Sequence, residues 1–151
     1  MEISLAQPAD IPALCDLLSE LFSQEAEFIP DRAAQERGLA AILAHPEAGH
    51  ILVARRDGRA LGMVSLQYLT STALGGRVAL LEDMVVTARV RGGGLGARLL
   101  SQAVALARNQ GCLRVTLLTD GDNAAAQRFY ARHGFKPSPM TPLRLAMPDQ
   151  A

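Results

Sequence analysis

The chain has 151 residues, the length of one ordinary domain, and its 15 basic and 15 acidic side chains cancel to a formal net charge of zero. This balance excludes the broad positive field that draws proteins to nucleic acids or anionic membranes. No stretch reaches the roughly 18 uninterrupted apolar residues of a membrane-spanning helix, and the first residues do not resemble a secretory signal. We therefore expect a single domain over residues 1–151, located in the cytoplasm, with neither nucleic acid nor a membrane as partner.

The cysteines and histidines do not predict a metal site. Cys15 and Cys112 have no metal-type spacing with each other or with a histidine pair. We expect both to be buried thiols rather than a disulfide, as is typical of a reducing compartment. The three histidines, His45, His50 and His133, are isolated in the sequence, and we expect surface or capping roles for them.

The first third of the chain predicts a short strand and two helices. The strand is expected around Ile3 and Leu5, and a helix follows Asp10, its expected N-cap. This helix has one apolar stripe at helical spacing, made by Ile11, Leu14, Leu17, Leu18, Leu21 and Phe22. A second helix follows Asp31 and ends before Pro46, because the residue before a proline is disfavoured in the helical conformation.

The middle third predicts a β-meander. Two β-rich runs, 51–55 and 60–69, are joined by a turn that contains Asp57-Gly58, and this pair is a strong hairpin signal. A Thr-, Ser- and Gly-rich loop then leads into a third long strand over 77–86. We expect these three strands to be antiparallel neighbours in one sheet.

The last third predicts two helices and two strands. An amphipathic helix runs from Leu95 to Ala107 and closes at Gly111, and the following run "CLRVTLLTD" is typical of a buried strand. Strand, crossover helix and strand form a parallel βαβ unit. A further helix over 123–132 closes at Gly134, and a final strand is expected over 143–147.

Four glycines stand at the start of the first of these helices, in the stretch Arg91-Gly92-Gly93-Gly94-Leu95-Gly96. Each costs ~1 kcal/mol in a helix interior relative to alanine, so the cluster favours a special backbone path or a bound ligand. Exposed N–H groups and the helix dipole make such a turn a site for a phosphate. A Walker loop is excluded, because Ala97-Arg98 stands where lysine and serine or threonine are needed.

Two phosphate ligands remain. The run from Gly92 to Ala97 satisfies the dinucleotide fingerprint, and Asp120 lies at a plausible distance for a ribose contact. The context disfavours this reading, because a meander precedes the glycines and too little sequence follows them for a long βαβαβ run. The other ligand is the pyrophosphate of coenzyme A.

Two motifs resemble the GNAT-type N-acetyltransferase superfamily. The stretch from Arg91 to Gly96 matches its R-x-x-G-x-G. The second motif, N-x-x-A-x-x-F-Y-x-x-x-G-F, is matched by Asn123, Ala126, Phe129, Tyr130, Gly134 and Phe135. The resemblance covers almost the whole chain and implies an α/β (α+β) fold. In this fold a mixed, mostly antiparallel twisted sheet is flanked by helices and has a central βαβ unit that binds acetyl-CoA.

The resemblance also implies the residues that bind the cofactor. A β-bulge opens a gap between two strands, the pantetheine arm lies in that gap, and the arm would pair with the backbone of Met84, Val85 and Val86. The Val86 N–H would stabilise the oxyanion. The pyrophosphate would lie on Arg91, Gly92, Gly93, Gly94, Gly96 and Ala97. Asn123 would contact the coenzyme. The alternative is that it serves only as the N-cap of the helix over 123–132, a position that asparagine favours.

The catalytic residues implied are Tyr130 and Glu82. Tyr130 would be the general acid for the departing thiolate, and the alternative is a tyrosine that only fills the core. Glu82 and Asp83 are adjacent carboxylates in an apolar strand, which are costly to bury unless they are used or paired. Glu82 would act as base and Asp83 would help to hold the cationic substrate. The alternative is a solvated pair, or one bridged to Arg77 or Arg89.

These residues predict an acetyl-CoA-dependent N-acetyltransferase that releases CoA. The acceptor would be a primary amine of a small molecule, a diamine, polyamine or amino-acid derivative, because Leu81-Glu82-Asp83 also resembles the diamine and polyamine branch. Acidic residues near the end of the first helix, Glu20, Glu25, Glu27 and Asp31, would line an entrance for a cation or simply be solvated. We expect a homodimer. The alternatives are an acetyl-CoA sensor without turnover on the same fold, and a binder of apolar peptides.

Overall fold

The computed structural model describes residues 1–24 and 29–147, which form two compact units divided between Asp120 and Gly121. The first unit contains β1 (Glu2–Leu5), η1 (Pro8–Asp10), α1 (Ile11–Gln24), α2 (Arg32–Ala44), β2 (Gly49–Arg56), β3 (Arg59–Ser71), β4 (Gly76–Val86), η2 (Ala88–Val90), α3 (Leu95–Asn109) and β5 (Val115–Leu117). The second unit contains α4 (Ala124–Arg132). The single domain over the whole chain stays a prediction.

The five strands form one sheet in the order β1-β2-β3-β4-β5. All neighbours are antiparallel except β4 and β5, which are parallel and joined through α3. The β2–β3 hairpin turns at Asp57 and Gly58, with φ of 52° and 76°, as a turn with two left-handed central residues requires. The predicted meander, hairpin and βαβ unit are confirmed, and so is the mixed, mostly antiparallel fold class.

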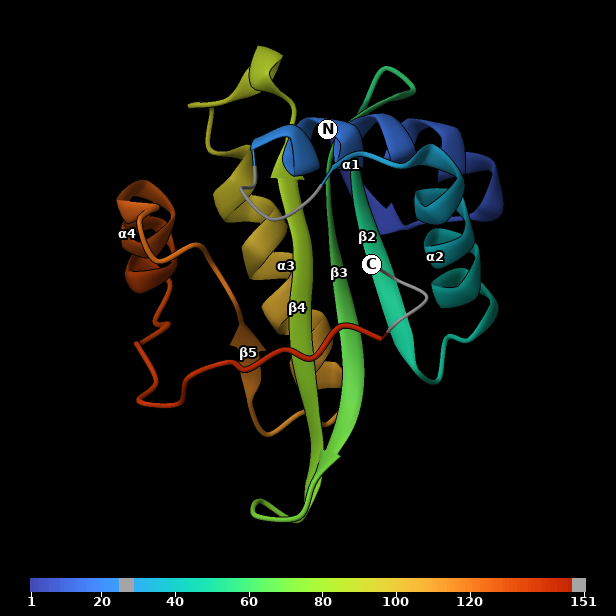
Figure 1. Ribbon diagram of the computed structural model, residues 1–151. Coiled ribbons are helices and arrows are strands. Elements are labelled where there is room, and N and C mark those ends of the chain that lie inside the picture. The colour runs from blue at the N-terminus through green and yellow to red at the C-terminus, as the bar shows by residue number, and fades with distance from the viewer. Residues whose placement is uncertain (25–28, 148–151) are drawn as a thin grey trace. The chain divides into compact units, whose positions relative to one another are not determined.

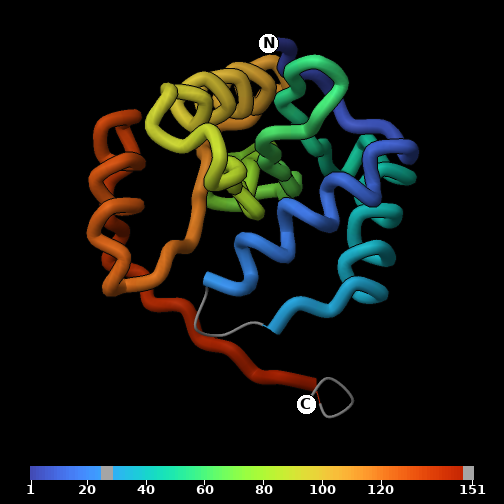
Figure 2. Tube along the Cα trace, turned by 90° about the horizontal axis from the view of Figure 1, so that it is seen from above, coloured from blue at the N-terminus to red at the C-terminus, as the bar shows by residue number. Residues whose placement is uncertain are grey.

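Helices cover both faces of this sheet (Figures 1 and 2). α1 and α2 lie on one face and α3 lies on the other. The main core cluster is on the α1 face, where Leu14, Leu17 and Leu18 of the predicted stripe are buried. They pack there with Cys15, Leu39, Ile51, Val53, Met63 and Val85. Among the described residues, no helix is long and apolar enough to cross a bilayer.

The start of the first helix differs from the prediction. A helical turn already begins at Pro8, so Gln7 is the N-cap and Asp10 is not. The Asp10 carboxylate accepts the Gln7 N–H at 2.7 Å and pairs with Arg55 of β2. Burial alone would raise the pKa of Asp10, but the hydrogen bonds from Arg55 and Gln7 lower it below its ordinary value. The second helix is as predicted, with Asp31 as its N-cap.

The end of the chain also differs. Of the predicted buried strand only 115–117 forms, as the last strand of the sheet, and its middle residue Thr116 is exposed. The strand predicted over 143–147 is absent, and Leu143 and Leu145 are 94% and 85% exposed. Alternating apolar residues form a strand only where a neighbouring strand accepts their hydrogen bonds.

A glycine on β3 explains how closely α3 approaches the sheet. A Cβ atom at Gly62 would lie 3.0 Å from the Val85 carbonyl oxygen, 3.3 Å from Val86 Cγ2 and 3.4 Å from Leu99 Cδ2. We therefore expect Gly62→Ala to lower the free energy of unfolding by about 1–3 kcal/mol in chemical denaturation. Gly38→Ala in α2 is the control: its Cβ meets nothing within 4 Å. It should stabilise the protein by up to about 1 kcal/mol. Equal stability of both variants would contradict this packing.

Candidate functional site

β4 contains a β-bulge formed by Asp83 and Met84. Ser65 of β3 pairs with Glu82, and Met63, two positions earlier in β3, pairs with Val85. The one β3 residue between them therefore faces two residues of β4, Asp83 and Met84. Asp83 has φ of +55°, in the left-handed region that residues other than glycine seldom adopt. The bulge that the family resemblance implied is confirmed at this position.

Ser65 ties the two strands together beside the bulge. Its side chain is almost fully buried, and its hydroxyl donates a hydrogen bond to the Glu82 carbonyl oxygen at 3.2 Å. A buried hydroxyl must find a partner to offset its loss of water. This bond therefore favours the register that leaves the extra residue at Asp83 and Met84.

The bulge reverses the direction of the β4 backbone groups. The Ala79 N–H donates to the Arg114 carbonyl at 2.9 Å, on the β5 side, whereas the Thr87 N–H donates to the Leu61 carbonyl of β3 at 2.8 Å. Eight residues apart in an unbroken strand, both N–H groups would point to the same side. The extra residue changes this, so the Val86 N–H, one position before Thr87, points away from β3.

The gap on that side of β4 begins just before the bulge. Parallel pairing with β5 covers Ala79 to Leu81, opposite Val115 to Leu117, and ends there. The β4 backbone from Glu82 to Val86 continues beyond this pairing. Beyond Leu81 no β5 residue pairs with β4 in the described part of the chain, and the Val86 N–H points to this side of β4.

The bulge also decides which way the side chains point. Strict alternation would place Glu82 on the same face as Met84 and Val86, but the bulge lies between them and changes this. Glu82 shares its face with Val85, which is buried in the α1 core cluster, and the Glu82 side chain is exposed. Val86 pairs with Gly62 and lies on the α3 face.

The glycine stretch forms a turn between η2 and α3. Gly92 and Gly94 have φ of +87° and +82°, so both positions need glycine for their conformation. Added Cβ atoms there would meet nothing within 4 Å, so the space above the turn is open. Gly94 is the N-cap of α3 and no side chain caps the helix, so its first N–H groups stay available. The Arg91 Nε donates to the Val86 carbonyl at 3.0 Å and links the turn to the end of β4.

Two of the acidic residues expected near the end of α1, Glu20 and Asp31, have separate partners. Glu20 accepts hydrogen bonds from the Ala88 N–H at 3.2 Å and the Thr87 hydroxyl at 3.4 Å, and so holds the start of η2. Asp31 caps α2, and its carboxylate accepts the Ala34 N–H at 3.2 Å. Glu25 and Glu27 lie outside the described residues.

A groove of about 310 Å³ lies between α1 and α2 and reaches the bulge. Its walls are mainly apolar, with Leu18 and Phe22 from α1 and Leu39 from α2. Two carboxylates also line it, Asp31 and Asp83. No pattern in the sequence identified this groove, because its two walls come from separate helices.

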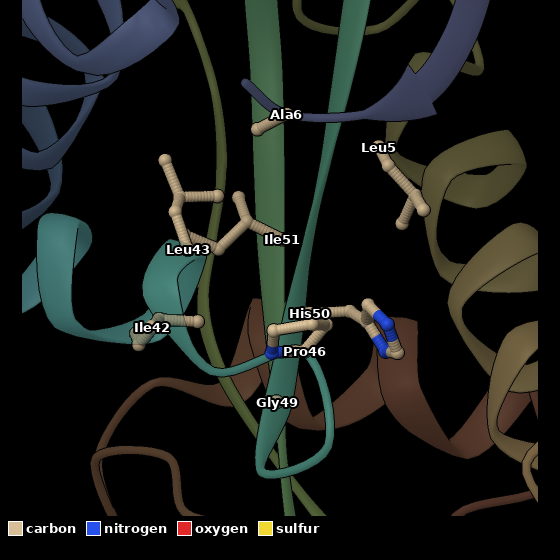
Figure 3. A pocket seen from close by; sticks show the side chains of 8 residues that line it. All are labelled: Leu5, Ala6, Ile42, Leu43, Pro46, Gly49, His50 and Ile51. Carbon is tan, nitrogen blue, oxygen red and sulfur yellow. The ribbon is translucent and has the colours of Figure 1, made fainter. Parts of the chain in front are cut away.

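A second depression is smaller, about 120 Å³, and lies where β1, β2 and the end of α2 meet (Figure 3). Ile42, Leu43 and Ile51 gather on one side of β2, and the His50 ring lies on the other. No predicted site residue lines it.

The sequence prediction for His50 is wrong. The side chain is half-buried, and its Nδ1 forms a hydrogen bond of 2.7 Å with the Tyr68 hydroxyl. The Arg77 guanidinium lies over the Tyr68 ring, 4.8 Å from its centroid. Burial raises the pKa of Tyr68 to about 12. His45 and His133 are the C-caps of α2 and α4, which confirms the capping roles predicted for them.

Asn123 and Tyr130 belong to the second unit. Asn123 is the N-cap of α4, and its side chain accepts the Ala126 N–H at 3.0 Å, so the capping role is confirmed. Tyr130 is half-buried between two rings, with centroids 5.2 Å from Phe129 and 5.7 Å from Phe135. Burial raises the pKa of Tyr130, so its hydroxyl stays protonated at neutral pH.

Both cysteines are free thiols. Cys15 is fully buried, but Cys112 is only half-buried, which corrects the expectation that both are buried. Burial raises the pKa of each thiol and so disfavours the thiolate.

Comparison with known proteins identifies the family. The family model for the acetyltransferase (GNAT) family matches residues 11–135. The chain belongs to the GNAT acetyltransferase family. It is therefore an N-acetyltransferase, as the motifs at Arg91 and Asn123 indicated.

Named relatives of this GNAT chain agree. An aminoalkylphosphonate N-acetyltransferase from Salmonella typhimurium is 31% identical over 91% of this chain and 86% of its own length. An uncharacterized N-acetyltransferase from Bacillus subtilis is also 31% identical, over 90% of each chain. A solved acetyltransferase from Trypanosoma brucei is 26% identical with a TM-score of 0.74, and the match covers 97% of this chain and 99% of that one.

Proposed function

We propose that the protein transfers the acetyl group of acetyl-CoA to a primary amine of a small molecule and releases CoA. The bulge in β4 carries this proposal, because it turns the Val86 N–H into the gap beyond β5. A fixed backbone donor aimed at a site of developing negative charge is the main requirement of acyl transfer.

The residues around the gap fit acetyl-CoA. Met84, Val85 and Val86 lie beyond the pairing with β5 and are the proposed backbone partners of the pantetheine arm. The open glycine turn and the uncapped start of α3, from Gly92 to Ala97, offer N–H groups to the pyrophosphate. Arg91 adds a positive charge beside this turn. From the second unit, Asn123 is proposed as a further coenzyme contact on the family motif that it opens. Bound in this way, acetyl-CoA supplies the thioester that the amine attacks.

Four of the chain's groups then divide the chemistry. The Val86 N–H stabilises the oxyanion on the thioester carbonyl. Glu82, exposed on β4, accepts the proton of the incoming ammonium directly or through water, and Asp83 helps to hold the cation. Tyr130, whose hydroxyl is protonated at neutral pH, donates a proton to the departing thiolate.

The amine attacks the thioester directly in a ternary complex. An acetyl-cysteine route needs an accessible thiolate, whereas Cys15 is buried and the pKa values of both thiols are raised. Candidate acceptors are the diamines, polyamines and amino-acid derivatives expected from the sequence. The aminoalkylphosphonate named for the Salmonella relative joins them.

Incubation with acetyl-CoA and a panel of such amines tests the function. Release of free thiol together with an N-acetylated product in the mass spectrum supports it. CoA binding without any product would instead favour an acetyl-CoA sensor.

We also propose that the protein is a homodimer, in which the exposed side chains of Leu143 and Leu145 become covered. Light scattering would detect the dimer as a doubled mass.

Gly94→Val is expected to weaken CoA binding by about tenfold or more in titration calorimetry. A branched side chain above the turn would displace the pyrophosphate from N–H donors, and each hydrogen bond to a charged group contributes about 1.5–3 kcal/mol. Gly75→Val is the matched control, because Gly75 has φ of +74° and equally open surroundings in the β3–β4 turn. If both variants bind CoA as tightly as the wild type, the cradle is misplaced.

Tyr130→Phe is expected to lower kcat by roughly 10²-fold, the usual effect of losing an acid catalyst, and to leave CoA affinity nearly unchanged. Phe129→Leu, a neighbour in the same ring cluster, controls for lost packing and should retain far more activity. A wild-type rate in Tyr130→Phe would exclude the phenol as the acid.

Glu82→Gln is expected to depress the rate most at low pH, where nearly all of the amine carries the proton that a base must remove. Raising the pH, or using an amine of lower pKa, should restore part of the activity. The measurement is the pH profile of kcat/KM for variant and wild type, and identical profiles would remove Glu82 from the mechanism. Thermal unfolding serves as the control for an exposed site, where no loss of stability is expected.

A further inference from the structure

We propose that Glu20 of α1 is a positioning residue for acetyl transfer. Its carboxylate holds the segment Thr87-Ala88 at the end of β4 and so fixes the direction of the Val86 N–H. In this role Glu20 contacts neither acetyl-CoA nor the amine, and it lies outside both sequence motifs. This role rests on the proposed function, in which the Val86 N–H stabilises the oxyanion.

A single carboxylate oxygen of Glu20 makes the contact. Its Oε1 accepts the Ala88 N–H at 3.2 Å and the Thr87 hydroxyl at 3.4 Å. Glu20 is half-buried and Thr87 is only 5% exposed, so the protein shields this contact partly from water. Partial burial strengthens a hydrogen bond, because the surroundings screen it less than water does. The contact therefore links the C-terminal half of α1 to the end of β4.

Glu20 supplies the capping acceptor that η2 lacks. Thr87 is the N-cap residue of η2, but its side chain makes no capping hydrogen bond. The first N–H groups of a helix need acceptors from outside the helix, and that of Ala88 finds one on α1. Truncation of Glu20 would leave the Ala88 N–H and the Thr87 hydroxyl to water, and this segment would lose a restraint on its backbone.

Contacts from three elements hold the backbone around the proposed oxyanion donor, and Glu20 makes the one from α1. The Thr87 N–H donates to the Leu61 carbonyl of β3 at 2.8 Å. The Arg91 Nε, at the start of the glycine turn, donates to the Val86 carbonyl at 3.0 Å. Because the pairing of β4 with β5 ends before this point, the direction of the Val86 N–H depends on these contacts.

The direction of the Val86 N–H affects the rate. An oxyanion donor must lie about 2.7–3.1 Å from the developing charge, and a displacement of about 1 Å costs about 10²-fold in rate. A looser end of β4 should therefore lower kcat. The pyrophosphate cradle is held separately, because Leu95 at the start of α3 is buried, so CoA affinity should hardly change.

The first test separates the reach of the Glu20 side chain from its charge. Glu20→Asp keeps the charge but withdraws the carboxylate by one methylene, and Glu20→Ala removes it. Both should lower kcat in the thiol-release assay by about tenfold or more and change the KM for the amine and the Kd for CoA by less than about threefold. Glu20→Gln keeps an oxygen acceptor at the same reach, so its kcat should stay within about threefold of the wild-type value.

Asp16→Ala is the matched control. Asp16 lies one turn earlier on α1, and its carboxylate pairs with Arg32 of α2 at 2.7 Å, so its loss loosens α1 without touching β4. Its kcat should equal that of the wild type. Thermal unfolding checks that each variant is folded, and Glu20→Asp decides the outcome if Glu20→Ala does not fold.

Wild-type kcat in folded Glu20→Ala and Glu20→Asp would overturn the positioning role while acetyl transfer stands. A loss in Glu20→Gln as large as that in Glu20→Asp would also overturn it, because the charge rather than the contact would then matter. Equal losses in Asp16→Ala and Glu20→Ala would show a general effect of α1 and have the same consequence. No thiol release by the wild type with any amine would refute the proposed function itself.

The second test detects the Val86 N–H without an amine. A hydrogen bond to the thioester carbonyl lowers the stretching frequency of that carbonyl, which infrared spectroscopy of bound, isotope-labelled acetyl-CoA measures. We expect the band at a higher frequency in Glu20→Ala than in the wild type and in Glu20→Gln. Identical bands in all three proteins would overturn the positioning role, whereas a wild-type protein that binds no acetyl-CoA would refute the proposed function.

Discussion

The extra residue in β4 is the constraint on which the rest of the proposed site depends. A strand presents its N–H groups alternately to its two neighbours, and one inserted residue reverses this order for everything that follows. Here the Ala79 N–H faces β5 and the Thr87 N–H faces β3, so the Val86 N–H points away from β3, as its proposed role as oxyanion donor requires. The buried Ser65 hydroxyl, bonded to the Glu82 carbonyl, supports that register.

The two helical layers stabilise this irregular strand from both faces. Val85, just after the bulge, is buried in the core cluster under α1, and Val86 packs toward Leu99 of α3 across Gly62. A bulge leaves part of the ladder unpaired, so packing must hold it in place. The same α1 and α2 that bury Val85 also form the groove, so the groove and the core share Leu18 and Leu39.

The cofactor end of the proposed site has the electrostatics that a pyrophosphate needs. The turn before α3 offers N–H groups, a helix dipole and the positive charge of Arg91. The hydrogen bond from Arg91 to the Val86 carbonyl also links this turn to the end of β4, so the two parts of the proposed cofactor site are held together.

The sequence by itself determined most of the elements, the family and the glycine turn. Periodicity, Asp57-Gly58 and the glycines at 92 and 94 act locally, over one or two turns of chain. The sequence pattern wrongly predicted a strand over 143–147, because a strand requires a neighbouring strand, which the local pattern does not reveal. Only the tertiary structure decided the phase of β4 at Asp83, the face of Glu82, the contact of His50 with Tyr68, and the groove. Each of these depends on register and packing between segments far apart in the chain, and alternation within a single strand contains no information about either.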